Sequence, residues 1–369
     1  MIKILFFIEN LSEGGAEKVL RELVNHMDRS KFDITVQTVW PCDAKKYLVP
    51  GIRYRSMYSQ RNKASVLRYR TEAEAGIAYR LHVKDDYDIE CAYLEMGPTK
   101  VMSASTNKKA KKLAWVHCDL SKKVDNAEAF VAKAGKQYRQ FDEVICVSEN
   151  VRESFERLFG AAVPTRVLYN VVDDASIREK SAGPLPTGLK KRRLTAASLG
   201  RLTHQKGYDL LLKVHDRLIR EGFEYDLWIA GEGEDRPKLE AFIQKHGLSD
   251  SVHLLGFQEN PYPILKAADL LVCSSRYEGL STFVTEGLIL GKPIVTTDCT
   301  GMRELLGDSE FGLITEMTED ALFEGMKKML QNDALRSDYQ KKAAERVLAF
   351  SKDRLVREIE AYFVKLAGK

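Results

Sequence analysis

The 369-residue chain lacks the features that mark several common protein classes. Its six cysteines are scattered without a C-x-x-C pair, and several stand in apolar runs. This indicates reduced core thiols and argues against a disulfide framework or a cysteine-based metal site. No apolar run approaches the roughly 20 residues that span a bilayer. There are also no tandem short repeats and no low-complexity tracts. The cysteines are Cys42, Cys91, Cys118, Cys146, Cys273 and Cys299.

A strong net charge is also missing, because 57 basic residues stand against 53 acidic ones, a formal balance of +4. This small excess argues against nucleic acid as a partner. Basic residues nevertheless gather locally. They are explained either as solvated surface charge or as a patch for a pyrophosphate-bearing acceptor or an anionic membrane. In the second case each basic residue would contribute roughly 1 kcal/mol of binding free energy near the anionic surface. The two clusters are Lys108, Lys109, Lys111 and Lys112, and Lys122 with Lys123.

The chain enters an apolar strand within its first residues, without a basic leader or a cleavage site. We therefore expect a cytoplasmic protein. Without a lipidation motif or a long amphipathic anchor, any membrane contact should be peripheral, at the inner face of the membrane.

Length and pattern predict two α/β domains. A chain of 369 residues exceeds one typical domain of roughly 100 to 200 residues. Segment 178–193 combines proline, glycine and charge without apolar periodicity, which is typical of a linker. We therefore expect an N-terminal domain over 1–177 and a C-terminal domain over 194–350. A final amphipathic helix over 351–369 has Leu355, Ile359, Phe363 and Leu366 on one face.

Both domains begin with a strand, a glycine-containing loop and an amphipathic helix, and further short apolar runs then alternate with helical patterns. This alternation predicts parallel, doubly wound sheets covered by helices on both faces. Ligands bind such sheets at the carboxyl ends of the strands, so two facing domains would form a cleft. The expected strands are 4–8, 34–39, 89–94, 113–116, 144–147 and 167–168, followed by 195–199, 227–230, 253–255, 270–273 and 294–297.

The most informative segment is S-S-R-Y-E-G-L-S-T-F-V-T-E-G-L-I-L-G-K-P-I-V-T-T, residues 274–297. Ser281 is a good N-cap, and Gly291 before Lys-Pro is a good stop, so we expect a helix over 282–290. Glu278 then lies in the preceding loop and Glu286 on the second helical turn. Because a helix N-terminus offers unpaired N–H groups and partial positive charge, a phosphate fits there, with both carboxylates free for neutral hydroxyls.

This segment, together with Gly200-Arg-x-x-x-x-Lys-Gly207, resembles the retaining glycosyltransferases of the GT-B fold, in the "group 1" family. The resemblance implies two Rossmann-like, doubly wound domains facing across a cleft, and a nucleotide sugar as donor substrate. It also implies that Glu278 contacts the transferred hexosyl group and that Glu286 holds the ribose. Many relatives have glycine in place of Ser281. We still expect the N–H groups of Ser281 and Thr282 to face the donor phosphate, in a tighter pocket.

Three further residues carry charge or hydrogen bonds to the donor in this family. Arg201 can bind a phosphate with a two-pronged fork, and Lys206 adds a mobile point charge, so the resemblance assigns both to the diphosphate. Without the resemblance, both could be solvated loop cations. His117 ends the strand 113–116, where the family has a histidine that bonds a hydroxyl of the donor sugar and fixes its orientation. A lone histidine at a strand end is otherwise often only a satisfied polar residue. We assign no chemistry to His204.

Weaker matches follow other strands in the expected order. A Gly-Gly turn faces the diphosphate and the acceptor in the family, and a G-x-G brings the backbone close to the nucleotide. A Gly-Phe follows the next strand, where relatives read the base with backbone atoms. Two polar residues close strands of the N-terminal domain and are interpreted as lining the cleft. In order, these positions are Gly14 and Gly15, Gly231 and Gly233, Gly256 and Phe257, and Ser148 and Asn170.

The implied chemistry is transfer of a hexosyl-type group from a UDP- or GDP-sugar with retention at the anomeric carbon. The departing phosphate oxygen would take the proton of the attacking acceptor hydroxyl, and the protein would position the substrates and stabilise the leaving charge. Asp86-Tyr-Asp88 has the form of a metal-binding Asp-x-Asp, but it precedes a strand instead of following one. We therefore expect neither a metal nor another cofactor.

The resemblance is strongest over 195–300. The sequence of the 274–297 motif is most similar to that of family members that assemble polysaccharides. The acceptor is therefore expected to be a saccharide, free or lipid-linked. Two other classes stay open, because a fold does not fix a function. One is another enzyme on the same scaffold, either a nucleotide-sugar epimerase or a phosphorylase with lysine-bound pyridoxal. The other is a nucleotide-sugar binding protein without chemistry.

Overall fold

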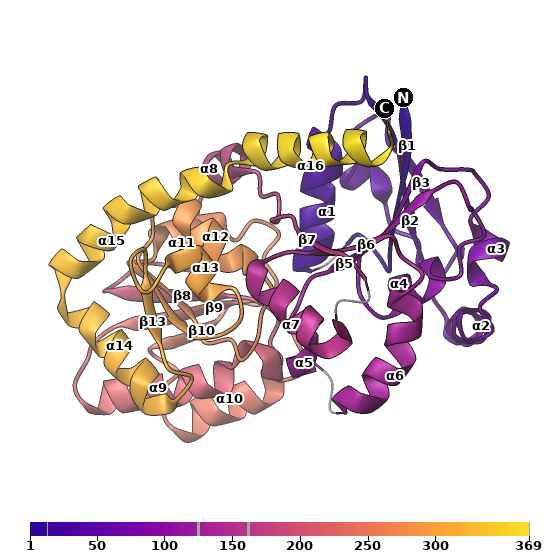
Figure 1. Cartoon of the computed structure of the whole chain (residues 1–369). Helices are drawn as coiled ribbons and strands as arrows, with labels where there is room; N and C mark the ends of the chain where they lie inside the picture. The colour runs from indigo at the N-terminus through magenta and orange to yellow at the C-terminus, as the bar shows by residue number, and fades with distance from the viewer. Residues whose placement is uncertain (13, 124–125, 161–162, 369) are drawn as a thin grey trace. The chain divides into compact units, whose positions relative to one another are not determined.

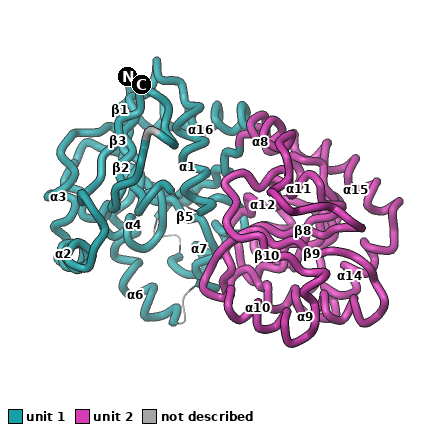
Figure 2. Tube along the Cα trace, turned by 180° about the vertical axis from the view of Figure 1, so that it is seen from behind, with its two compact units in different colours: residues 1–172, 352–369 teal, residues 173–351 magenta. Residues whose placement is uncertain are grey.

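A computed structural model describes residues 1–12, 14–123, 126–160 and 163–368 (Figure 1). The chain divides into two compact units, shown in different colours in Figure 2. Unit 1 comprises residues 1–172 and 352–369, and unit 2 comprises residues 173–351. Each unit is built around one parallel sheet, so the α/β class with two doubly wound sheets is confirmed.

The division between the units differs from the predicted linker at 178–193. Helix α8 (Asp174–Lys180) already belongs to unit 2. Beyond it, Lys191 pairs with Asp269 at 2.6 Å and Arg193 pairs with Asp226 at 2.8 Å. Two of the charges that suggested a solvated linker thus pair with acidic residues at strands of unit 2. The boundary therefore lies after Val172.

Unit 1 contains a seven-stranded sheet in the order β3-β2-β1-β4-β5-β6-β7. Because the chain leaves β1 in one direction and β4 in the other, a topological switch point lies between these two strands. The strands are β1 (Ile2–Ile8), β2 (Phe32–Thr38), β3 (Arg53–Ser56), β4 (Ile89–Ala92), β5 (Lys111–Val116), β6 (Glu143–Cys146) and β7 (Thr165–Val167). The helices are α1 (Gly15–His26), α2 (Lys63–Glu74), α3 (Ala78–His82), α4 (Gly97–Met102), α5 (Leu120–Lys123), α6 (Ala127–Tyr138), α7 (Glu149–Phe159) and α16 (Lys352–Leu366), with a 3-10 turn η1 at Ala44–Lys46.

The last helix, α16, packs onto the core of unit 1. The ring of Phe363 lies 6.1 Å from that of Phe6 and 6.3 Å from that of Trp115, measured between centroids. Glu360 accepts a hydrogen bond of 2.6 Å from the backbone N–H of Asp28. The aromatic face of the C-terminal helix and its buried carboxylate together fasten it to strands at the start of the chain.

Unit 2 contains a six-stranded sheet in the order β10-β9-β8-β11-β12-β13, with its switch point between β8 and β11. Helices α9, α10 and α14 lie on one side of this sheet and α11, α12 and α13 on the other (Figure 1). The strands are β8 (Thr195–Leu199), β9 (Asp226–Ala230), β10 (Val252–Leu254), β11 (Leu270–Cys273), β12 (Ile294–Thr297) and β13 (Leu313–Thr315). The remaining elements are η3 (His204–Lys206), α9 (Tyr208–Arg220), α10 (Arg236–Lys245), α11 (Tyr262–Ala267), α12 (Thr282–Ile289), α13 (Met302–Leu306), α14 (Glu319–Gln331), α15 (Asp333–Arg346) and η4 (Val347–Phe350).

One cluster of buried apolar side chains joins the unit 2 sheet to the helix layer of α9, α10 and α14, and it includes Leu211, Ile229 and Met326. Two of the strands, β3 and β13, were not predicted from the sequence, and both lie at sheet edges. All six cysteines are free, and five of them are buried. Among the described residues, no helix has both the length and the apolar character that crossing a membrane requires.

Candidate active site

The strongest predicted motifs meet at the switch point of unit 2. The loop after β8 and the loop after β11 are joined by several hydrogen bonds. The backbone N–H of Arg276 donates to the carbonyl of Gln205 at 2.7 Å, and the Gln205 amide donates to the carbonyl of Tyr277 at 2.9 Å. The Ser274 hydroxyl donates to the carbonyl of Lys206 at 2.8 Å. Two segments about 70 residues apart in the chain thus form one connected structure.

Lys206 and Glu278, both predicted as catalytic, form an ion pair there. The Lys206 Nζ lies 2.6 Å from Glu278 Oε1, and the side chains are 20% and 9% exposed. The hydroxyl of Ser275 donates to the same carboxylate oxygen at 2.6 Å. Burial disfavours the charged amine, but the adjacent Glu278 carboxylate outweighs it and raises the pKa of Lys206. Lys206 is therefore a cation at physiological pH.

Two glycines of the G-R-x-x-x-x-K-G loop make close contacts, and the contact of Gly207 requires glycine. A Cβ at Gly200 would lie 3.2 Å from Cε of Lys206, so the lysine chain passes directly over this position. Gly207 has a φ of +64°, and a Cβ there would stand 2.1 Å from the carbonyl oxygen of Ser274. Glycine at position 207 therefore allows the two loops to touch.

Replacing Gly207 with alanine should lower the stability of the protein by about 2 to 4 kcal/mol, because a left-handed backbone and a backbone clash both oppose the methyl group. Gly247→Ala is the matched control, since Gly247 has a φ of +67° and nothing within 4 Å of its Cβ position. The free energy of unfolding of both variants is measured in urea, and the difference between the two values gives the cost of the clash. Equal losses would show that the loops do not depend on this contact.

Arg201 lies beside this ion pair in the sequence but differs from it in environment. Its side chain is exposed, and among the described residues no hydrogen-bond or ion-pair partner is found for its guanidinium. An exposed guanidinium in the same loop as a buried ion-pair residue is available to an anionic ligand. His204, to which no chemistry was assigned, is exposed, and its carbonyl accepts a 2.7 Å hydrogen bond from Arg276.

Helix α12 begins at Thr282, as predicted, and ends at Ile289, one residue early. Ser281 is its N-cap and accepts a hydrogen bond of 3.4 Å from the N–H of Val284. The N–H groups of the first helical residues have no partner within the helix, so this end of α12 suits an anion. Glu286 lies on the second turn, is 4% exposed, and has Oε1 at 3.5 Å from the hydroxyl of Tyr262.

The glycines of the predicted G-x-G bring two loops of unit 2 together. A Cβ at Gly231 would lie 2.0 Å from the carbonyl oxygen of Gly200, and one at Gly233 would lie 2.3 Å from that of Leu202. These positions therefore need glycine for packing, whatever else they do. Gly256 accepts a 2.8 Å hydrogen bond from the N–H of Gly231, and Phe257 beside it is 66% exposed.

In unit 1, His117 directly follows β5, at the carboxyl edge of the sheet. Its ring lies 4.9 Å from that of Tyr93, and its Nε2 atom is buried and has no hydrogen-bond partner among the described residues. Burial lowers the pKa of His117 to about 4, against the opposing effect of Glu95. The imidazole is therefore neutral at pH 7, which agrees with an orienting role and not with a cationic one.

Glu95 is a candidate that the sequence analysis missed. It follows β4, is 3% exposed, and forms an ion pair of 2.8 Å with Lys123. Its carboxylate also accepts a hydrogen bond of 3.1 Å from the backbone N–H of His117. Burial opposes ionisation, but Lys123 and His117 outweigh it and lower the pKa of Glu95 to about 2. No motif includes Glu95, and only its position after a central strand could have indicated it.

The other predicted residues of unit 1 have local structural roles. Gly14 has a φ of +107° and is the N-cap of α1, whose first residue is Gly15. Ser148 is fully buried and caps α7 by accepting a 3.2 Å hydrogen bond from the N–H of Val151. Asn170 is 8% exposed and follows β7. These predicted residues thus follow the carboxyl ends of β1, β6 and β7.

The Asp-x-Asp string lies at the opposite edge of the sheet. Asp88 immediately precedes β4 and accepts a 2.8 Å hydrogen bond from the backbone N–H of Lys3. The basic clusters are partly neutralised, because Lys123 pairs with Glu95 and Lys111 lies 3.6 Å from Asp142. Lys108 and Lys109 remain exposed.

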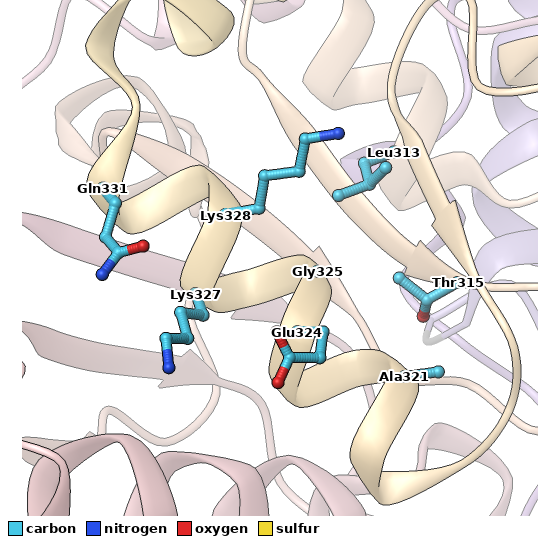
Figure 3. Close-up of a pocket in the computed structure, with 8 residues that line it drawn as sticks. All are labelled: Leu313, Thr315, Ala321, Glu324, Gly325, Lys327, Lys328 and Gln331. Carbon is cyan, nitrogen blue, oxygen red and sulfur yellow. The ribbon is translucent and has the colours of Figure 1, made fainter.

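A hollow of about 490 Å³ lies elsewhere in unit 2, between α14 and the edge strand β13 (Figure 3). None of the predicted site residues lines it. A smaller hollow of about 140 Å³ adjoins the loop after β8, and Thr203, His204 and Asp209 are among its lining residues. The charged residues that line the larger hollow are at the surface and form no titratable cluster. We therefore place the candidate site at the loops after β8 and β11.

Comparison with known proteins identifies glycosyltransferase domains in both units. The family model described as "Glycosyl transferases group 1" matches residues 185–346, and "Glycosyltransferase Family 4" matches 13–176. The chain is 28% identical over 374 residues to the N-acetylgalactosamine-N,N'-diacetylbacillosaminyl-diphospho-undecaprenol 4-alpha-N-acetylgalactosaminyltransferase of Campylobacter jejuni, covering 99% of this chain and 100% of that one.

Solved structures share the fold of the whole chain. Sucrose-phosphate synthase from Thermosynechococcus elongatus has a TM-score of 0.80 at 18% identity and covers 99% of both chains. Anabaena HepE in complex with UDP has a TM-score of 0.76 at 18% identity and covers 99% of this chain and 100% of that one. The GT-B fold class is thereby confirmed, and the matches to glycosyltransferases span both units.

Proposed function

Because the chain belongs to the group 1 glycosyltransferases, we propose that it transfers a hexosyl-type group from a UDP- or GDP-sugar to a saccharide carried on a lipid-linked or polysaccharide precursor. The observation that carries this proposal is the buried Lys206–Glu278 pair at the switch point of unit 2. This edge is where open α/β sheets bind their ligands. The acceptor class is supported by the Campylobacter jejuni relative, whose name specifies a diphospho-undecaprenol acceptor.

In this proposal the donor diphosphate binds the exposed Arg201, the charged Lys206 and the N–H groups at the start of α12. These groups are aimed in advance at the charge that develops as the diphosphate leaves, so they stabilise it without reorganisation. Glu278 keeps Lys206 charged and contacts the transferred sugar, while Glu286 holds the ribose hydroxyls. His117 bonds a hydroxyl of the sugar as a neutral imidazole.

We further propose that the anomeric configuration is retained. The acceptor hydroxyl attacks from the face that the diphosphate leaves, a new glycosidic bond forms as the sugar–phosphate bond breaks, and the acceptor proton passes to the departing phosphate oxygen. The chain then needs no carboxylate nucleophile. Proton NMR of the product, read from the anomeric coupling constant, tests this, and inversion would contradict it.

The proposed function is tested by incubating the protein with UDP-, GDP- and ADP-sugars and a lipid-linked saccharide, and by measuring nucleotide release and product mass. We expect one nucleotide class to be released only when an acceptor is present. An altered donor sugar without acceptor would indicate an epimerase. Binding of nucleotide sugar without turnover under any acceptor would indicate a binding protein.

Removal of divalent metal should leave the transfer rate unchanged, because the proposed charge stabilisation comes from Arg201, Lys206 and helix N–H groups. The measurement is the transfer rate after dialysis against EDTA, with and without added Mg²⁺ or Mn²⁺. An Asp88→Asn variant serves as the matched control for the Asp-x-Asp string and should be as active as the wild type. A rate that falls more than about tenfold on chelation and returns with metal would overturn the metal-free mechanism.

A further inference from the structure

The turn that follows β4 in unit 1 combines a buried charge with unusual backbone geometry. Glu95 is followed by Met96, whose φ of +66° is rare for a residue with a side chain. Met96 is also 38% exposed, so this conformation is not explained by packing into the core. Strained residues of this kind persist where the surrounding structure holds them, often at functional sites. The turn lies at the carboxyl edge of the sheet, next to the switch point between β1 and β4.

Glu95 connects this turn to the neighbouring turn after β5. One carboxylate oxygen, Oε2, accepts the hydrogen bond from the N–H of His117 at 3.1 Å. The other, Oε1, accepts from the thiol of Cys118 at 3.0 Å and pairs with Lys123 at 2.8 Å. A single carboxylate thereby contacts three residues of the segment 117–123, which carries His117. A buried carboxylate that makes only such contacts is well suited to holding a neighbour in place.

The groups around the His117 ring determine which of its nitrogens carries the proton. The His117 ring packs against Tyr93, and the main chain of Tyr93 acts to raise the pKa of the imidazole, as a carbonyl facing a ring N–H does. Because Nε2 has no partner, the donor is Nδ1. A neutral ring with its proton on Nδ1 presents Nε2 as a hydrogen-bond acceptor. Nε2 can accept a hydrogen bond from a hydroxyl, but it has no proton to donate to a phosphate oxygen.

We propose that Glu95 is a positioning residue for His117, holding its turn and its tautomer so that Nε2 accepts a hydrogen bond from a hydroxyl of the sugar substrate. Lys123 keeps Glu95 ionised and has no contact of its own with the substrate in this arrangement. The identity of the hydroxyl-bearing ligand rests on the proposed function, whereas the tautomer and its dependence on Glu95 do not. The two parts can therefore be tested separately.

The first test is nuclear magnetic resonance of the full chain with ring-¹⁵N-labelled histidine, in the donor-free state at pH 7. The chain has seven histidines, and the resonance lost in His117→Gln identifies the ring. We expect the wild type to carry the proton on Nδ1. In Glu95→Gln we expect the Nε2–H form, which predominates in unrestrained imidazole, or an exchange average. A wild-type ring protonated on Nε2, or an unchanged tautomer in Glu95→Gln, would overturn the proposal.

Glu90→Gln is the matched control for loss of a buried carboxylate. Glu90 lies on β4 itself, is fully buried, and accepts hydrogen bonds from Tyr79 and Ser105, not from the His117 segment. Its replacement should destabilise the protein without changing the His117 tautomer. If Glu95→Gln does not fold because Lys123 is left without its counter-charge, the double variant Glu95→Gln/Lys123→Met removes both charges and takes its place.

The second test is a double-mutant cycle on sugar transfer. Since a misplaced group can cost on the order of 10²-fold in rate, we expect Glu95→Gln and His117→Gln each to lower kcat/KM by about that factor. The combined variant should lose no more than the single ones, because Glu95 acts through His117. Additive losses would overturn the positioning role. If the wild type transfers no sugar, the proposed function fails, and the tautomer measurement still decides the role of Glu95.

Discussion

Replacing Lys206 with methionine should lower kcat/KM for sugar transfer by about 10²- to 10³-fold, the usual cost of removing one preorganised group from a developing negative charge. Lys206 is a largely buried cation held by Glu278 at 2.6 Å, so its charge is fixed in place before the donor binds. The loss should fall mainly on kcat, because the leaving diphosphate carries more charge on the scissile oxygen in the transition state than in the bound donor. Steady-state kinetics with the preferred donor provides the measurement.

The Lys206→Met variant also leaves the Glu278 carboxylate buried and unpaired, which typically costs about 3 to 5 kcal/mol of stability. The double variant Lys206→Met/Glu278→Gln separates the two effects. It should recover most of the lost melting temperature, since no uncompensated charge remains, while activity stays low. Recovery of both stability and activity would show that the pair serves the fold and not the reaction.

Replacing Glu286 with alanine should weaken nucleotide binding by about 10²-fold, which corresponds to about 3 kcal/mol, the upper range for hydrogen bonds to a charged group. The side chain is 4% exposed on the second turn of α12, where a carboxylate can accept hydrogen bonds from two vicinal ribose hydroxyls. Titration calorimetry with UDP and GDP measures the affinity. A deoxyribose analogue should lose affinity for the wild type but little further affinity for Glu286→Ala.

Thr285→Val is the matched control for general disturbance of α12. Thr285 precedes Glu286, is 3% exposed, and donates its hydroxyl to the carbonyl of Ser281 at 3.0 Å. The substitution keeps the shape of the side chain and removes only this bond, so nucleotide affinity should stay close to that of the wild type. An equal loss in both variants would indicate that the integrity of the helix, and not the Glu286 carboxylate, determines binding.

The elements that carry the candidate site could be predicted because their signals are local. Buried parallel strands are short apolar runs, and 195–199, 270–273 and 294–297 have the predicted bounds. The N-cap at Ser281 is a property of one side chain and the N–H groups that follow it. The family resemblance, carried by the same short motifs, agrees with the family models that match 185–346 and 13–176.

The edge strand β3 was missed because no continuous apolar run marks it, and the edge strand β13 is only three residues long. β3 reads Arg-Tyr-Arg-Ser, and its Arg53 and Arg55 pair with Asp33 and Asp85 at 3.0 and 2.8 Å. Charged residues are common on edge strands, where one side of the ladder has no neighbour. The predicted linker differs from the division between the units for a related reason, since the partners of Lys191 and Arg193 are distant in the sequence.

The sequence by itself determined the alternation of strands and helices, the helix that begins after Ser281, and the residue types that suit a nucleotide sugar. Only the tertiary structure decided which residues act together. It paired Lys206 with Glu278 across 72 positions and placed Glu95 against the turn of His117 across 22. It also explained Gly207, Gly231 and Gly233 by contacts with distant backbone. The reason is physical, because periodicity and capping depend on neighbours in the chain, whereas ion pairing and close approach depend on neighbours in space.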